Sequence, residues 1–438
     1  MDVSFHYLPV ASSLLSSEDS RRTVGEYAAG LGGIGGSEVG PESIGTSRRL
    51  VYLVLTGGTE RRILDLENDR TNSVPDEPVV LVAYPGRNSL PAALEVLARL
   101  QQDGADGRIV FLDGADDANG LSRLAAAVSG ESGKSPATGR NRTLNPDRLL
   151  HGKKIGLIGE PSDWLVASSP PHELVKGTWG AEVVTIAMAE LYGRVAAADR
   201  ALVEGFAATF RDGASDVREP MGADLEASAA VYAALRSLVD DLCLDAVTVR
   251  CFDLVTERGA TGCLALSRLA DDGIVAACEG DLVSALAMLW LRDRLGQPSW
   301  MANPSRVDVA SSTLWLAHCT VPRCMVSDYA LRSHFESGLG AAIQGSLPKG
   351  PVTLLRIGGK RLDRVWVTEG EITARGTNET MCRTQVEARL RGSAPGAGSD
   401  ASTPSVADLL EEPLGNHLVL VRGAVAGDLI AGHGGLSG

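Results

Sequence analysis

The sequence predicts an α/β protein with two doubly wound domains followed by a β-rich domain. Continuous apolar runs alternate with helix-like segments from residue 50 onward, the same alternation starts again at residue 153, and short Val-, Thr- and Ile-rich runs take over near residue 350. Alternating strands and helices indicate a parallel sheet covered by helices, whereas short strands separated by turns indicate antiparallel pairing. The expected fold therefore has Rossmann-like N-terminal and central domains and a C-terminal β-rich domain.

The first 47 residues are rich in Ser and Gly, and we expect an N-terminal extension that serves as a flexible arm or an assembly element. The N-terminal α/β domain is predicted to span residues 48–150. Its strands are expected where apolar residues run without interruption, as in strands buried on both faces: 50–55, 79–83 and 108–112. Residues 90–100 (LPAALEVLARL) have the apolar spacing of an amphipathic helix.

The central α/β domain is predicted to span residues 151–345. It begins with KKIGLIG at 153–159 and continues with a long helix over 225–243 and a strand over 246–252. The C-terminal β-rich domain is assigned to residues 346–438, with a Ser/Gly/Ala/Pro linker at 392–407. Its strands are expected in the short β-branched runs: 352–357, 364–368, 371–374, 386–390 and 418–421.

Composition excludes several classes of protein. The 438 residues carry 41 basic and 55 acidic side chains, a formal charge of −14, which disfavours binding to nucleic acid through a basic face. The seven cysteines form no CxxC pair, so neither a disulfide framework nor a zinc finger is predicted. No apolar run reaches the length of a membrane span and the first residues do not resemble a secretory signal, so we expect a cytoplasmic protein with no membrane partner.

Candidate metal ligands follow apolar segments far apart in the chain. Glu279 comes after the apolar residues 274–277 and before a strongly apolar helix at 282–295. Asp281 is well placed to cap the N-terminus of that helix. His318 follows the apolar run 314–317, and His417 lies in a loop. Carboxylate and imidazole ligands from separate loops would suit Mn²⁺ or Zn²⁺, although a histidine at a strand end is often only a core residue.

Residues from about 245 to 421 resemble the L-fucose isomerase-like family, which is related to L-arabinose isomerase. The motifs that carry the resemblance are CFDL (251–254), GCLALSRLADDGIVAACEGDLVSALAML (262–289), LAHCTVP (316–322), SHFESGLGAAIQG (333–345), GPVTLLRIGG (350–359), CRTQV (382–386) and PLGNH (413–417). LTGGTE (55–60) and PGRNSLPAALE (85–95) resemble the N-terminal domain of the same family. The resemblance implies three-domain subunits in trimers or hexamers, a Mn²⁺ ion at the active site, and interconversion of an aldose pentose or deoxyhexose with its ketose.

The resemblance also implies roles for individual residues. Glu279 matches the first of two acids that bind the metal and move protons, and His318 and His417 match metal ligands. The second acid falls at Asn303. An amide can offer its carbonyl oxygen to a metal but cannot act as a base.

Three consequences of Asn303 stay open at this point. Glu279 performs all proton transfer, or Asp308 or Glu336 supplies the missing carboxylate, or the protein is not an aldose–ketose isomerase. In the last case it is a carbohydrate-binding or sensor protein, or it has another metal-dependent activity on sugars.

Four further residues are candidates for binding a small-molecule sugar through hydrogen bonds: Asn88, His334, Gln344 and Asn416. Asn88 could equally stabilise its own loop, and Gln344 could be an ordinary polar residue at a strand end. Asn416 could also orient the neighbouring His417.

Overall fold

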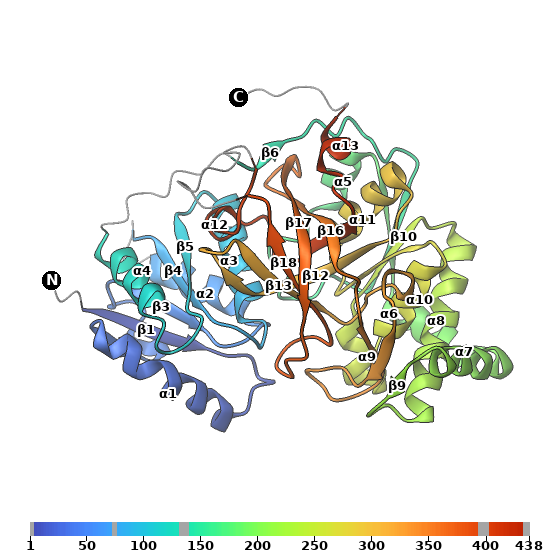
Figure 1. The fold of residues 1–438 in the computed structure, drawn as a ribbon, viewed down its shortest axis with the longest axis horizontal. Coiled ribbons are helices and arrows are strands. Elements are labelled where there is room, and N and C mark those ends of the chain that lie inside the picture. The colour runs from blue at the N-terminus through green and yellow to red at the C-terminus, as the bar shows by residue number, and fades with distance from the viewer. Residues whose placement is uncertain (1–3, 72–76, 131–139, 393–402, 432–438) are drawn as a thin grey trace.

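A computed structural model describes residues 4–71, 77–130, 140–392 and 403–431. Two parallel sheets flank one antiparallel sheet, as Figure 1 shows: the first sheet is blue, the antiparallel sheet is orange and red in the middle, and the green and yellow elements of the second parallel sheet lie on the other side. The α/β class and the antiparallel character of the C-terminal strands are confirmed. In the described part of the chain, no helix has both the length and the apolar character needed to cross a bilayer.

The first sheet has five parallel strands in the order β2-β1-β3-β4-β5. Its strands are β1 (Phe5–Val10), β2 (Gly36–Glu38), β3 (Leu50–Val54), β4 (Val79–Ala83) and β5 (Gly107–Phe111). Its helices are α1 (Ser17–Gly33), α2 (Glu60–Thr71), α3 (Ser89–Gln102) and α4 (Ala118–Ser129).

The interpretation of residues 1–47 as an extension is wrong for the part that the structure describes. Strand β1 lies between β2 and β3, with His6 paired to Leu50, and Phe5, Tyr7 and Leu8 are buried. The Ser- and Gly-rich composition surrounding β1 concealed a strand that buries apolar side chains in the same core as β3.

The second sheet has four parallel strands in the order β11-β10-β7-β8. Its strands are β7 (Lys154–Ile158), β8 (Glu182–Ile186), β10 (Ala246–Val249) and β11 (Val275–Cys278). The helices in this part of the chain are α5 (His172–Trp179), α6 (Met188–Ala196), α7 (Arg200–Asp212), α8 (Gly222–Leu242), α9 (Cys251–Arg258), α10 (Cys263–Asp271) and α11 (Leu282–Leu295). The expected long helix corresponds to α8, and the strand expected at 246–252 ends at Val249 because α9 begins at Cys251.

The antiparallel sheet has the strand order β16-β19-β12-β13-β18-β17-β6, with an additional pairing of β16 to β17. Its strands are β6 (Arg142–Thr143), β12 (Ser299–Asp308), β13 (Thr313–His318), β16 (Gly350–Gly358), β17 (Arg364–Arg375), β18 (Thr384–Leu390) and β19 (Leu418–Arg422). Strands β12 and β13 come from the segment assigned to the central α/β domain, so the antiparallel sheet starts well before residue 346 in the chain.

The two short strands expected at 364–368 and 371–374 form one strand, β17. Gly370 lies inside it rather than in a turn. A Cβ at this position would lie 2.5 Å from the backbone oxygen of Arg389 on β18, so the close approach of the two backbones requires glycine.

The remaining elements are a small sheet in the order β15-β14-β9 and several short helices. They are β9 (Asp216–Val217), β14 (Tyr329–Arg332), β15 (Ala342–Gly345), α12 (Val406–Glu411), α13 (Ala426–Ile430) and the 3₁₀ helices η1 (Pro41–Ser43) and η2 (Arg323–Met325). Of the linker expected at 392–407, residues 393–402 lie outside the described residues, and α12 begins at Val406.

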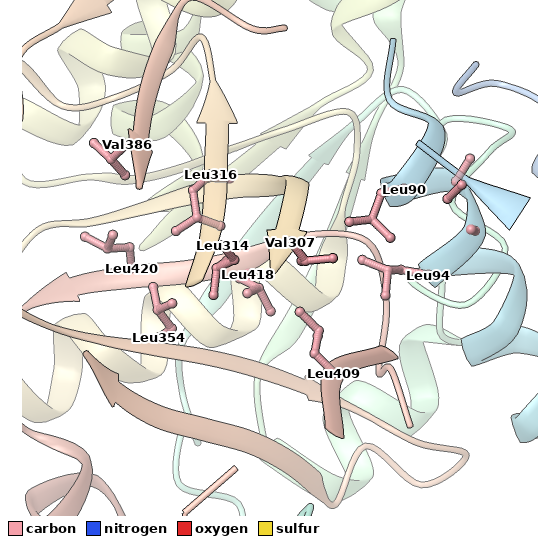
Figure 2. Packing of buried hydrophobic residues seen from close by; sticks show 14 of the residues in the cluster. Leu90, Leu94, Val307, Leu314, Leu316, Leu354, Val386, Leu409, Leu418 and Leu420 are labelled. Carbon is pink, nitrogen blue, oxygen red and sulfur yellow. The ribbon is translucent and has the colours of Figure 1, made fainter. Parts of the chain in front are cut away.

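The antiparallel sheet buries both of its faces. Figure 2 shows Leu90 and Leu94 of α3 beside Leu314, Leu418 and other labelled apolar side chains of one face. Val419 lies between Leu418 and Leu420 in the chain, but its side chain packs on the opposite face, in the core that contains α11. Successive side chains of a strand point to opposite faces, so the sheet is held between α3 and α11. This packing brings the end of β13 beside the middle of β12, where Asn303 pairs with Ala317.

Candidate metal centre and substrate pocket

The candidate centre begins at the turn between β11 and α11. Glu279 and Gly280 both have left-handed backbone conformations, with φ of 65° and 73°. A side chain at Gly280 would bring its Cβ within 2.8 Å of the Cα of Pro161, so only glycine fits there. A non-glycine residue with this backbone conformation is uncommon and is often found at functional sites. The turn directs the Glu279 carboxylate away from the helix and toward the other candidate ligands.

Asp281 caps α11 as expected, because its Oδ1 accepts a hydrogen bond from the backbone N–H of Ser284 at 2.7 Å. Its other oxygen, Oδ2, accepts a hydrogen bond from His417 Nδ1 at 2.9 Å and lies 3.2 Å from Arg356 Nη1. Both Asp281 and His417 are completely buried. Because the carboxylate fixes the proton on Nδ1, the Nε2 atom of His417 is left as the nitrogen that can bind a cation.

Three predicted ligands lie together. The Oε1 atom of Glu279 is 3.5 Å from His417 Nε2 and 3.9 Å from His318 Nε2, and the ligand atoms of all three residues lie within 4.8 Å of one another. His318 is oriented by Thr320, whose hydroxyl lies 2.8 Å from Nδ1. Both histidines therefore present Nε2 to the same carboxylate.

Unpartnered buried atoms at this point fit a divalent cation. Among the described residues, His417 Nε2 and the Oδ1 atoms of Asn303 and Asn416 have no hydrogen-bond partner, although all three residues are buried. Leaving such atoms unpaired is costly, so each calls for an explanation such as a bound ion or water. A donor set of one carboxylate and two imidazoles suits Mn²⁺ or Zn²⁺. Asn303, on β12, lines the adjacent pocket with its neighbour Asn416.

The charges of the three ligands are mutually stabilising. Burial alone would raise the pKa of Glu279, but the positive charges of His417 and His318 outweigh it and hold that pKa well below its usual range. Burial alone would lower the pKa of His417, but Glu279 and Asp281 raise it to about 9. Without a cation, the proton on His417 therefore balances part of the negative charge.

A cavity of about 230 Å³ opens beside the candidate centre. Its lining comes from the N-terminal sheet, the β11–α11 turn and the loops of the antiparallel sheet, and includes Glu60, Arg87, Asn88, Trp164, Glu279, Asn303, Glu336, Glu379 and Asn416. This volume is below the roughly 300 Å³ at which drug-sized pockets begin, and it suits a ligand as small as one monosaccharide.

Glu336 is the carboxylate that the sequence proposed as a substitute for the second acid, and it lines this pocket. Its Oε1 accepts a hydrogen bond from Asn88 Nδ2 at 2.8 Å. Although the side chain keeps contact with solvent, the surrounding protein reduces its hydration and Glu279 is negatively charged, which together raise the pKa of Glu336 to about 8. Asp308, the other substitute considered, lies outside the pocket lining and bonds to Ser311 in its own turn.

Sequence reasoning missed several residues of the pocket, and two of them bear directly on its chemistry. Glu60, at the start of α2, is only 2% exposed, and its Oε2 has no partner among the described residues. Burial, with the charges of Glu95 and Glu279, raises the pKa of Glu60 well above its usual range. Trp164 donates its indole N–H to Glu279 Oε2 at 2.5 Å. Glu60 ends the quoted motif LTGGTE and could have been found there; Trp164 carries no local signal.

Two of the expected sugar-binding residues lie outside the pocket lining. Gln344 Oε1 accepts a hydrogen bond from Arg332. His334 is buried, with its ring against Phe252 and its Nδ1 3.2 Å from Ser337 Oγ. Asn416 does line the pocket, but the residue that orients the His417 imidazole is Asp281.

Comparison with known proteins points to sugar isomerases. No family model matches the chain. It is 27% identical over 226 residues to the sulfoquinovose isomerase of Alkalicoccus urumqiensis, which covers 50% of each protein. It is 27% identical over 120 residues to the protein of the same name from Priestia aryabhattai, covering 26% of this chain and 27% of that one. The sulfoquinovose isomerase of Clostridium sp. (strain MSTE9) is 28% identical over 123 residues, with 27% and 28% covered.

The matched region thus spans about half the length of the first of these relatives and about a quarter of the others. The similarity supports the sugar-isomerase part of the expectation. The more specific resemblance to L-fucose isomerase stays a prediction. By sequence the chain is similar to sugar isomerases, and it has a pocket of monosaccharide size beside a group of metal-ligating side chains.

Proposed function

We propose that this protein is a divalent-metal-dependent aldose–ketose isomerase. The observation that carries the proposal is the convergence of Glu279, His318 and His417 on one point, with Glu279 also lining a small pocket. The names of the matched relatives support the reaction class. The metal is proposed to be Mn²⁺, held by these three residues with the Asn303 carbonyl oxygen as a fourth ligand.

When bound, the cation would polarise the two neighbouring sugar oxygens and stabilise developing negative charge. The protein must then provide a group that removes a proton from one carbon and returns it to the next. Asn303 cannot do so, because an amide is not a base. Glu279 is a weak base, because its pKa is held low.

Glu336 is the best-placed alternative among the described pocket residues. A catalytic base works best when its pKa is near the working pH, and the pKa of Glu336 is raised to about 8. Asn88 holds the carboxylate by donating to Oε1, which leaves Oε2 for the substrate. In this account Glu336 moves the proton, and Glu60, a buried acid of the pocket lining, forms a hydrogen bond with a sugar hydroxyl.

The charge of the pocket favours a neutral substrate. Its lining includes four acidic side chains, Glu60, Glu279, Glu336 and Glu379, of which Glu60 and Glu336 have raised pKa values, whereas Arg87 is the single basic residue in the described lining. A neutral pentose or deoxyhexose therefore fits better than an anionic sugar. The relatives' name refers to a sulfonated sugar, and Arg87 would be the residue to bind a sulfonate in that case.

Asn303 also supports a second candidate, a binding or sensor protein that keeps the pocket but lacks turnover. The expected trimer or hexamer is likewise a proposal, to be measured by light scattering of the purified chain.

Turnover in D₂O tests the proposed function. Mn²⁺-loaded protein is incubated with neutral pentoses, deoxyhexoses and sulfoquinovose, and products are identified by NMR. Formation of a ketose with deuterium at the carbon next to the carbonyl, lost in Glu279→Gln, is the expected result. Saturable sugar binding without any product would favour the binding protein, and turnover of sulfoquinovose alone would contradict the neutral substrate.

A further inference from the structure

A second group of metal-ligating side chains lies outside the pocket lining. A ring nitrogen of His334 and the sulfur atoms of Cys263 and Cys319 lie within 4.8 Å of one another, and all three residues are buried. Nothing in the proposed isomerisation uses them.

These three residues come from separate elements. Cys263 is the first residue of α10, Cys319 follows β13, and His334 follows β14. Cys319 is the neighbour of His318, and successive side chains of an extended chain point in opposite directions. His318 therefore lies with Glu279 and His417, whereas Cys319 lies on the other side of the same backbone, in the second group.

We propose that Cys263, Cys319 and His334 bind a structural zinc ion, with Cys382 as the fourth ligand. This inference is independent of the isomerase activity. Zinc in structural sites is usually tetrahedral, and three cysteines with one histidine are an ordinary ligand set. Thiolate ligands favour zinc over Mn²⁺, so the two centres would select different ions.

The spacing of the ligand atoms fits this ion. Two sulfur atoms, each about 2.3 Å from a tetrahedral zinc, lie about 3.8 Å apart. The observed limit of 4.8 Å requires only small shifts of side chains to reach that distance. Cys382 belongs to the same buried cluster as Cys263 and Cys319, and its sulfur would have to move toward the three atoms that lie within 4.8 Å of one another.

The surroundings also suit bound thiolates. The cluster also contains Ala317, Ala342 and Met381, and Phe335 packs against it. The backbone N–H of Arg383 points at the Cys319 sulfur at 3.5 Å, the kind of contact that stabilises a sulfur carrying negative charge. Each thiol that binds the ion releases its proton to solvent, so binding is accompanied by measurable proton release.

Such an ion would fasten α10 to the antiparallel sheet and to the segment 333–338. That segment includes Glu336, which lines the pocket. The zinc would thus fix one wall of the pocket without contacting the substrate.

Zinc analysis in a variant that lacks the pocket ligands tests the proposal. The full-length Glu279→Ala/His417→Ala protein is expected to retain stoichiometric zinc after exchange into Zn²⁺ and removal of excess ion. Adding Cys319→Ser should abolish that zinc and lower the Tm. Adding Cys243→Ser and Cys324→Ser instead, at the two exposed cysteines, should leave the zinc in place.

Cobalt substitution of the otherwise unaltered protein keeps the proposal testable if Cys319→Ser fails to fold. Co²⁺ at this site should give the intense sulfur-to-cobalt absorption of thiolate ligation, together with proton release. Absence of bound zinc in Glu279→Ala/His417→Ala while all thiols are reduced would overturn the proposal. So would a disulfide bond between two of Cys263, Cys319 and Cys382, located by peptide mapping; a disulfide between Cys251 and Cys278, whose sulfur atoms lie 3.1 Å apart, is distinguished by the same map.

Discussion

The Nδ1 atom of His417 lies 2.9 Å from the Oδ2 atom of Asp281, and neither side chain is exposed. Asp281 thereby joins two functions: one oxygen caps α11 and the other fixes the ring of a candidate metal ligand 136 residues away in the chain. The helix cap and the candidate metal site consequently share one carboxylate.

Replacement of Asp281 with Asn should weaken metal binding while preserving much of the cap, because Asn is also a good cap residue. Loss of the charged acceptor for His417 is expected to lower the affinity for Mn²⁺ by about 10- to 100-fold. Calorimetric titration measures the effect. The matched control is Asp117→Asn, which changes the carboxylate that caps α4 and should leave Mn²⁺ affinity unchanged. If both variants bind Mn²⁺ with equal affinity, Asp281 does not orient His417 for the metal.

The metal-free protein should lose stability on the alkaline side because of His417. Its pKa rises from 6.5 to about 9 on folding, so the protonated form stabilises the native state. That contribution is complete below pH 6.5 and disappears as the pH rises through about 9. Urea unfolding of wild type and His417→Gln across this range should show a difference that shrinks with pH; a constant difference would contradict the assigned protonation.

Glu336→Gln is expected to lower kcat by roughly 10²- to 10⁴-fold, the usual effect of removing a catalytic base. Asp308→Asn should turn over close to the wild-type rate, because Asp308 bonds within its own turn. Mn²⁺ affinity should be retained in both variants. A normal rate in Glu336→Gln would show that another group transfers the proton.

Gly280→Ala should be more harmful than an equivalent change elsewhere on α11. Gly280 and Gly296, which flank the helix, both have positive φ, so alanine at either position costs about 1–2 kcal/mol in backbone strain. At Gly280 the added Cβ would also meet the backbone of Glu160 and Pro161, whereas nothing lies within 4 Å at Gly296. Chemical denaturation should therefore show a larger loss of stability in Gly280→Ala, accompanied by weaker Mn²⁺ binding; similar values for both variants would contradict the tight packing of this turn.

The sequence was most informative where a local pattern and a functional position coincide. Glu279 and His318 were found because each follows an uninterrupted run of apolar residues, although the two strands belong to different sheets. The cap formed by Asp281 was also predictable, since capping depends on residues only three positions apart. These features need no knowledge of the tertiary arrangement.

Interactions between distant segments could not be predicted in this way. The second hydrogen bond of Asp281, the indole contact of Trp164 with Glu279, and the unpartnered carboxylate of Glu60 depend on how separate elements pack. Strand β1 was missed for a related reason: its pairing with β3, rather than its composition, makes it a central strand. Gln344 was selected because its polar side chain could bind a sugar. In the structure its Oε1 accepts a hydrogen bond from Arg332 instead.

The most direct test of the account is Mn²⁺ binding measured by electron paramagnetic resonance on wild type, Glu279→Ala and His417→Ala. Wild type should bind Mn²⁺ stoichiometrically, and both variants should lose this binding while keeping the wild-type circular dichroism spectrum. Absence of bound Mn²⁺ in wild type, or unchanged binding in both variants, would contradict the proposed centre formed by Glu279, His318 and His417.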